Sequence, residues 1–217
     1  MDGSKEDGVG DERYFRLFVI WLRDAEVFGR YQRGVAAVAA RYGGVERSLA
    51  PQAVYGDGLA LPDIVNVAYA NSREAMDEMS DDPEFQAVVP LRSASVDLAF
   101  VDGVVERGEI SEHGLAARQY LVELARFGPA GAAGYRGYER EAEAFMAGYG
   151  YHVERVLRPD GAVEGLPFRP DVVKVAYFDD DAAMDRMHAD PGHARLEGEL
   201  YDEAVAQSLW LVGTART

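Results

Sequence analysis

The 217-residue sequence predicts an α+β fold in which two tandem ferredoxin-like β-α-β-β-α-β units pack sheet to sheet. The main evidence is an internal repeat: residues 62–83 and 170–191 are identical at twelve of twenty-two positions, at a constant offset of 108. Two further observations support the fold. Both copies show the same order of strand and helix patterns, and each copy would form a sheet with one uncovered apolar face.

Each copy begins with a strand that is followed by a long amphipathic helix. The strand patterns are the apolar runs at 14–22 and 119–127. In the helices, apolar residues recur at spacings of three and four, which places one stripe along the helix, and a glycine suited to a left-handed C-cap follows. The stripe and cap positions are Phe28, Tyr31, Val35, Val38, Tyr42 and Gly43, and then Tyr135, Tyr138, Ala142, Phe145, Tyr149 and Gly150.

Three more strands and a short helix complete each copy. A strand that opens with Val-Glu-Arg precedes a turn rich in glycine and proline, and a strand with period-two alternation follows the turn. The short helix is expected to begin at Ser72 or Asp180 and to bury two methionines, and an Asp-Pro pair ends it. A short helical segment then leads to the closing strands at 96–103 and 207–213.

The two copies are expected to cover each other. Both helices of such a unit lie on one face of its sheet, so the other face is apolar and must be buried. We expect the two sheets to form an intramolecular barrel, so that the monomer is a pseudo-dimer; a homodimer of the whole chain stays an alternative. The expected division is a disordered tail at 1–12, a first repeat at 13–103, a linker at 104–117 and a diverged second repeat at 118–217.

Composition excludes several classes of function. The formal net charge is −16, which repels nucleic acids and anionic membrane surfaces, and no apolar run is long enough to span a membrane. The chain has no cysteine, so disulfides and thiolate chemistry are excluded. The acidic, glycine-rich start is not a signal peptide. These features predict a cytoplasmic protein whose partner is a small molecule.

Several segments resemble a known family. They are the aromatic-rich first helix that ends at Tyr42-Gly43-Gly44, the stretch Ser-Arg-Glu-Ala-Met-Asp-Glu-Met at 72–79, and Pro-Leu-Arg at 90–92. Over about 13–105, this pattern resembles the dimeric α+β barrel proteins of the domain-of-unknown-function 1330 family. The second copy is similar more loosely over 117–214, and Leu200 stands where the first copy has Arg92. The resemblance implies the fold; the wider superfamily includes cofactor-free monooxygenases, isomerases and haem-handling proteins, so it leaves the reaction open.

His152 and Arg92 are the candidate catalytic residues. Signatures of nucleotide, flavin, nicotinamide and serine-hydrolase sites are absent, so no cofactor is expected. His152 lies in a one-residue insertion of the second copy, and an imidazole there could enter the cleft between helix and sheet and transfer protons. The Arg92 guanidinium could bind a carboxylate, phenolate or enolate, although an ion pair with Asp97 or Asp82 is an equally good interpretation.

Four tyrosines of the helix stripes are candidate substrate-binding residues. Tyr31, Tyr42, Tyr138 and Tyr149 could line an apolar cleft and orient a small aromatic or polyketide-like ligand, although such stripes are more often core. His188 and His193 occur only in the second copy. Their spacing of five, with a proline between them, is not that of a helical metal site, so they are weak metal candidates and no metal is expected.

The sequence leaves three functions open. The first is a cofactor-independent enzyme that acts on a small, largely apolar metabolite of secondary metabolism by proton transfer, cyclisation, isomerisation or oxygenation. In that hypothesis His152 is the acid or base, and Arg92 or tyrosine hydroxyls stabilise negative charge. The second is a non-catalytic binding or interaction protein. The third is a haem or metal-binding protein that uses His152, His188 or His193.

Overall fold

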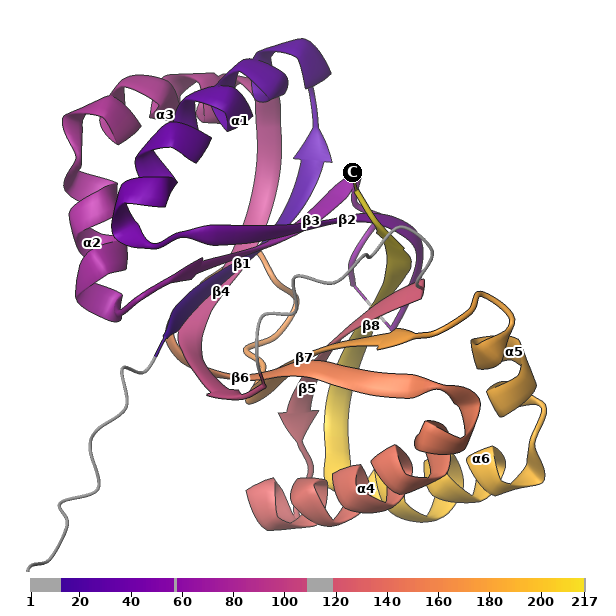
Figure 1. Ribbon diagram of the computed structural model, residues 1–217. Helices are drawn as coiled ribbons and strands as arrows, with labels where there is room; N and C mark the ends of the chain where they lie inside the picture. Colours follow the sequence, from indigo (N-terminus) through magenta and orange to yellow (C-terminus); the bar gives the residue numbers. More distant parts are fainter. Residues whose placement is uncertain (1–12, 57, 109–118, 217) are drawn as a thin grey trace, which may run out of the picture.

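In the computed structural model, which describes residues 13–56, 58–108 and 119–216, eight strands form one closed barrel with helices on its outside (Figure 1). The expected tail at 1–12 and positions 109–117 of the expected linker lie outside the described residues. The helices of the first repeat cover one side of the barrel, and those of the second repeat cover the opposite side. The predicted pseudo-dimeric α+β barrel is therefore confirmed.

Each repeat supplies half of the barrel as four antiparallel strands. The strand order is β4-β1-β3-β2 in the first half and β8-β5-β7-β6 in the second, which is the split β-α-β order. The strands are β1 (Tyr14–Leu22), β2 (Val45–Tyr55), β3 (Ile64–Ala70), β4 (Val96–Arg107), β5 (Gln119–Phe127), β6 (Tyr151–Glu164), β7 (Val172–Phe178) and β8 (Val205–Ala215).

The helices follow the predicted order, and a left-handed glycine ends the long helical segment of each repeat. Gly43 and Gly150 have φ values of 70° and 73°, as the C-cap requires. None of the helices in the described part of the chain is long and apolar enough to cross a membrane. The helices are α1 (Ala25–Ala39), η1 (Ala40–Tyr42), α2 (Arg73–Asp81), α3 (Pro83–Ser95), α4 (Gly131–Met146), η2 (Ala147–Tyr149), α5 (Ala183–His188), α6 (Pro191–Leu196), η3 (Glu197–Tyr201) and α7 (Asp202–Ala204).

Two seams between the repeats close the barrel, β2 with β8 and β4 with β6. Each seam places a glycine opposite a proline: Gly213 faces Pro51, and Gly103 faces Pro159. Proline has no N–H to donate, and the register shifts beside both pairs. A Cβ at either glycine would overlap a carbonyl oxygen of the facing strand. The same device at both seams shows that the pseudo-twofold symmetry extends to the interface.

Strand alternation separates the core into a barrel interior and two layers under the helices. In β1, Phe15, Leu17 and Val19 face the interior, whereas Tyr14 and Ile20 pack under the helices. All five are almost fully buried. Burial of one large apolar side chain contributes about 1.5–3 kcal/mol, so both faces of each sheet stabilise the fold. The cavities described below lie in the helix layers.

Three element boundaries differ from the sequence prediction. β6 continues to Glu164, through residues expected to be a turn, because it pairs with β4 as far as Phe100. β4 reaches Arg107, which is four residues into the segment expected as linker. The helix expected at Asp180 begins at Ala183, and the Asp180 carboxylate accepts two hydrogen bonds from Arg186.

Candidate functional site

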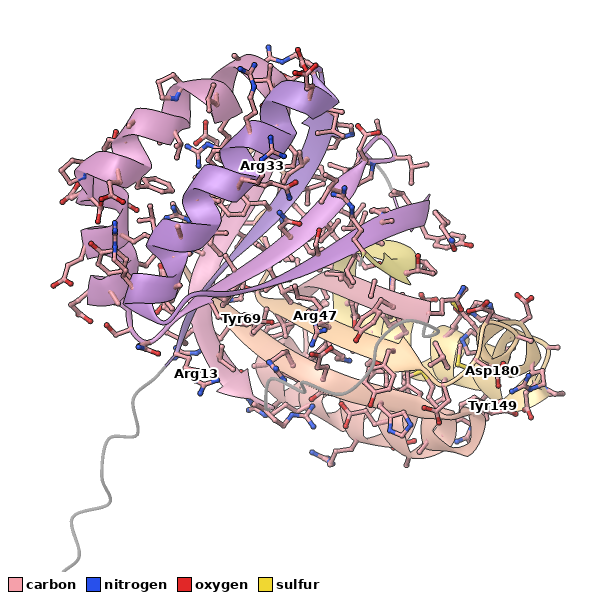
Figure 2. The ribbon with its side chains drawn as sticks, turned by 45° about the horizontal axis from the view of Figure 1, so that its top comes forward. Arg13, Arg33, Arg47, Tyr69, Tyr149 and Asp180 are labelled. Carbon is pink, nitrogen blue, oxygen red and sulfur yellow. The ribbon has the colours of Figure 1, made fainter. Side chains whose placement is uncertain are left out.

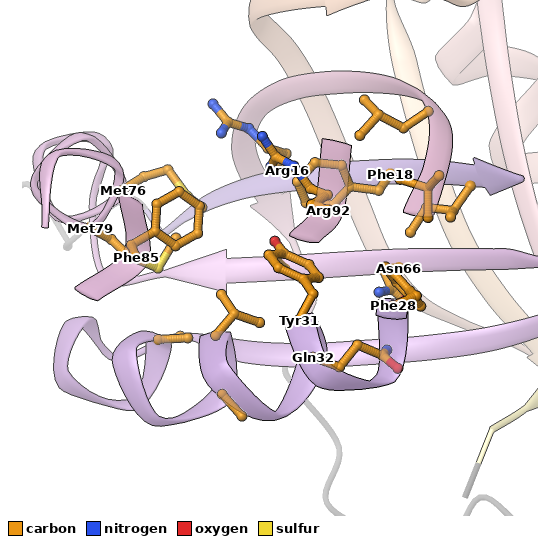
Figure 3. A pocket seen from close by; sticks show the side chains of 18 of the residues that line it. Arg16, Phe18, Phe28, Tyr31, Gln32, Asn66, Met76, Met79, Phe85 and Arg92 are labelled. Atoms are coloured by element: carbon orange, nitrogen blue, oxygen red, sulfur yellow. The ribbon is translucent and has the colours of Figure 1, made fainter. Parts of the chain in front are cut away.

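The first repeat holds a cavity of about 190 Å³ between its sheet and its three helices (Figure 3). Its wall is mostly apolar, with residues such as Phe28, Met76 and Phe85. Polar groups enter at a few points only. They are Arg16 from β1, Tyr31 and Gln32 from α1, Asn66 from β3 and Arg92 from α3. A largely apolar cavity with a few convergent polar groups is typical of a small-molecule site.

Arg92 and Tyr31 meet at this cavity, where both were predicted to act. The Arg92 guanidinium carbon lies 5.9 Å from the Tyr31 ring centroid. The alternative partners that the sequence suggested for Arg92 are taken, because Asp97 pairs with Arg23 and Asp82 pairs with Arg41. Within the described residues, Arg92 has no carboxylate partner, so the cavity wall carries an uncompensated positive charge.

The second arginine of the cavity is held in place. Arg16 forms a two-pronged ion pair with Asp102, with nitrogen–oxygen distances of 2.6 and 2.7 Å, and this pairing raises the pKa of Arg16. Asn66 is buried and accepts a hydrogen bond of 2.8 Å from Ser48. Arg16 is therefore a neutralised, oriented group, whereas Arg92 supplies net charge.

In the second repeat, a buried ion cluster replaces these polar lining residues. By strand register and repeat offset, Lys174 stands for Asn66 and Glu139 for Gln32. Glu123 lies opposite Lys174, as Phe18 lies opposite Asn66 in the first repeat. Lys174 Nζ lies 3.2 Å from Glu123 Oε2 and 3.6 Å from Glu139 Oε1. Burial has the largest single effect and lowers the pKa of Lys174. The charges around it, that of Glu123 first, together outweigh burial and raise the pKa well above its ordinary value. Lys174 is thus charged at neutral pH.

Tyrosines complete the cluster. Tyr135 donates a hydrogen bond of 3.2 Å to Glu123, and burial followed by the Glu123 charge raises the tyrosine pKa. Tyr151 stands where the first repeat has Gly44, because His152 pairs with Tyr177 as Val45 pairs with Tyr69. The Tyr151 ring is almost fully buried. Gly44 lines the first cavity, whereas a bulky phenol occupies the equivalent region of the second repeat.

A second cavity of about 520 Å³ lies between the sheet of the second repeat and α4 to α6, in the cleft that corresponds to the first cavity. Tyr138, His188 and His193 line it, and the two imidazole rings meet edge to face at 4.8 Å. Trp210 donates a hydrogen bond of 3.1 Å to the Tyr201 hydroxyl at its wall. Among the described residues, no group of three or more His, Cys, Asp or Glu side chains is arranged to hold a metal ion.

Tyr42 and Tyr149 line neither cavity; both act at helix ends. Tyr42 donates to Asp82 at 2.8 Å and Tyr149 donates to Asp190 at 2.5 Å. The two aspartates are the N-caps of α3 and α6, so each tyrosine ties the end of the long helical segment to the start of a later helix. The hydroxyl bonds lower the pKa of both carboxyl groups. These two tyrosines are structural groups.

His152 does not enter the cleft between helix and sheet, in contrast to the sequence expectation. Its side chain is 48% exposed and lies on the face of β6 opposite to Tyr151. Its ring stacks on Tyr177 at 5.0 Å, and Nε2 lies 3.1 Å from Asp179. Since it lines neither cavity, it is not positioned to transfer a proton there.

The repeated Val-Glu-Arg motif connects the two repeats inside the barrel. Arg47 donates to Glu154 of the other repeat at 2.6 Å, and the Arg155 guanidinium lies 5.6 Å from the Tyr69 ring (Figure 2). Glu154 and Arg155 are buried. This ion pair spans β2 and β6 and so joins the two repeats.

Among the lining residues that sequence reasoning missed are Arg16, Gln32 and Asn66 in the first cavity and Tyr55, Tyr201 and Trp210 in the second. Arg16 and Asn66 carry a usable signal. They are polar residues at helix-facing positions of apolar strands, where the second copy has Leu121 and Lys174 instead. Tyr55 has no such signal, because its place in the second cavity depends on the β2–β8 seam.

The fold is that of the dimeric α+β barrel proteins, and comparisons with solved structures agree. An anthrone oxidase-like protein is 15% identical, with a TM-score of 0.65 over 95% of this chain and 92% of its own. A chlorite dismutase variant from Candidatus Nitrospira defluvii is 10% identical, with a TM-score of 0.61 over 94% and 92%. A candidate monooxygenase from Lactobacillus acidophilus NCFM is 11% identical, with a TM-score of 0.53 over 95% of each chain.

Comparisons with known sequences assign the chain to no family. No family model matches the chain, and no curated protein matches it. The resemblance to the domain-of-unknown-function 1330 family therefore stays a prediction. At identities of 15% and below, the structural matches establish the fold and leave the chemistry to the residues of the site.

Proposed function

We propose that the chain is a cofactor-independent enzyme that binds a small, largely apolar metabolite in the first-repeat cavity and stabilises its anion. The observation that supports this most strongly is Arg92, an arginine on an otherwise apolar wall that has no carboxylate partner among the described residues. In such a setting, a phenolate, enolate or carboxylate of the ligand is the natural partner of the guanidinium.

The first step is loss of a proton from the bound metabolite. Arg92 lowers the pKa of an acidic O–H or C–H by stabilising the conjugate base, and one pKa unit corresponds to about 1.4 kcal/mol. Tyr31 lies beside Arg92, where its hydroxyl can orient the substrate oxygen. The described lining has no carboxylate or imidazole, so the proton passes to water rather than to His152.

The anion then reacts by isomerisation, cyclisation or direct oxygenation. In oxygenation of a ring CH₂ group, the substrate carbanion is oxidised by O₂, which yields a ketone and water. The likeness to an anthrone oxidase-like protein and to a candidate monooxygenase favours this third reaction. A cavity of about 190 Å³ has room for a molecule of one or two rings, because about 150 Å³ already holds benzene.

A spectroscopic titration tests the stabilised anion directly. We expect bound 4-nitrophenol, whose phenolate absorbs in the visible range, to ionise at a pH at least one unit lower than the free dye. Arg92→Gln should abolish this shift, because a hydrogen bond to a charged partner contributes about 1.5–3 kcal/mol. Arg33→Gln is the matched control, since Arg33 is an exposed arginine of α1 outside the cavity (Figure 2).

The alternative is binding without catalysis, which the missing base in the lining favours. Oxygen uptake and product formation with a panel of one- and two-ring phenols, hydroxynaphthalenes among them, separate the two. Turnover that Arg92→Gln abolishes and Arg33→Gln retains supports the enzyme. If the pKa of the bound dye were the same in Arg92→Gln as in the wild type, both the enzyme and the non-catalytic binding protein would be contradicted. That result would show that the cavity does not hold the anion at this arginine.

A further inference from the structure

The second-repeat cavity differs from the first in both size and charge. We propose that it is a separate binding site for an organic cation, namely a quaternary or protonated amine on an apolar body. Its volume of about 520 Å³ suits a larger ligand than the first cavity takes. The two cavities share only the repeat ancestry, so this proposal is independent of the function proposed for Arg92.

Aromatic rings form much of the wall. The Tyr138 and Tyr201 rings meet edge to face with centroids 5.1 Å apart, and Tyr201 lies 6.0 Å from the Trp210 ring. Burial raises the pKa of Tyr138 and of Tyr201, so both are neutral phenols at pH 7. The faces of such rings attract cations, and tryptophan does so most strongly. Three methionine sulfurs add polarisable surface; they belong to Met146, Met184 and Met187.

The charges of the lining select the same kind of ligand. Glu197 is the single Asp, Glu, Lys or Arg among the lining residues described, and its carboxylate lies 3.6 Å from His193 Nδ1. Burial, more than the opposing effect of Glu197, lowers the pKa of His193, so its imidazole is uncharged at pH 7. The first cavity has the opposite pattern, with two arginines and no carboxylate. The net charge of −16 adds long-range attraction for a cation.

The site is complete only when the two repeats are joined. Tyr55 and Gly56 of the first repeat line this cavity, and Tyr55 lies directly opposite Trp210 in the β2–β8 seam. Side chains of directly opposed residues in an antiparallel pair project to the same face. Tyr55 is 53% exposed, which is unusual for an aromatic residue, and a ligand would cover it. The first repeat therefore supplies part of the mouth of a site in the second.

A pair of shape-matched probes tests the proposal by calorimetry. 4-Hydroxyphenyltrimethylammonium carries a quaternary nitrogen where 4-tert-butylphenol carries an uncharged carbon. We expect the wild-type protein to bind the cation at least fivefold more tightly than the neutral probe. Trp210→Leu and Glu197→Gln should each lower this ratio at least threefold, because they remove a ring face and the carboxylate.

Matched controls make the outcome specific. Glu203→Gln removes an exposed carboxylate outside the cavity, and Arg92→Gln alters the first cavity; both should keep the wild-type ratio. Glu197 is largely exposed, so its variant folds even where loss of Trp210 does not. Equal affinity for the two probes, or a ratio that Glu197→Gln leaves unchanged, would overturn the proposal. Neither outcome bears on anion binding at Arg92.

Discussion

Replacement of Lys174 by methionine is expected to destabilise the protein strongly. The ammonium is almost fully buried 3.2 Å from the Glu123 carboxylate, which is itself almost fully buried. At an effective dielectric constant of 20, Coulomb attraction at that distance is about 5 kcal/mol. The variant leaves the Glu123 charge with Tyr135 as its remaining hydrogen-bond donor. Removal of one partner of a buried pair costs about 3–5 kcal/mol.

Urea unfolding followed by circular dichroism measures this cost. For a chain of this length, a loss of 3–5 kcal/mol corresponds to a fall in melting temperature of about 6–20 °C. Arg195→Met, on the exposed surface of α6, should change the free energy of unfolding by less than about 0.5 kcal/mol. The double variant Lys174→Met/Glu123→Leu removes both charges and should recover most of the lost stability. Strictly additive losses would refute the claim that these two groups form one coupled pair.

Three further changes have definite expected results. Ala68→Leu fills the first cavity from β3, so it should abolish 4-nitrophenol binding while the melting temperature stays the same or rises; retained binding would place the ligand elsewhere. Tyr149→Phe removes the hydroxyl bond to Asp190 and should lower the melting temperature without changing either ligand affinity; weaker binding in either cavity would contradict its structural role. Because burial lowers the folded-state pKa of His193 below 6.5, the stability it contributes is present above pH 6.5 and is lost as the pH falls through and below it. His193→Phe, which copies Phe85 of the first repeat, should therefore flatten the decline in unfolding free energy between pH 7 and 5, and an unchanged slope would exclude His193 as its source.

The architecture was predictable because the repeat displays it twice. Helix stripes, left-handed glycines and alternating strands each specify local structure, and the repeat shows that two equal sheets must cover each other. Turn residues were less informative. Pro159 lies inside a strand because it sits at a seam, and pairing across that seam depends on residues of the other repeat.

The candidate site was predictable only in part. Tyr31 and Arg92 come together because the apolar stripe of α1 and the helix α3 face the same cleft. Tyr42 lies on the same stripe, but at its last turn, where it reaches the Asp82 cap instead of the cavity. For His152, one residue decides the outcome. The strand pleat turns Tyr151 toward the helix layer and its neighbour to the opposite face of the sheet, and an insertion near that point makes the face impossible to assign from the sequence.

The β2–β8 seam has a consequence for the synthesis of the chain. Of the eight barrel strands, β8 is synthesised last, and it pairs with β2, about 160 residues earlier in the sequence. Until it emerges from the ribosome, the inner face of the first sheet and the free edge of β2 have no permanent cover. The newborn first repeat therefore exposes an apolar surface and an open strand edge for seconds, which is the condition under which chaperone binding competes with aggregation.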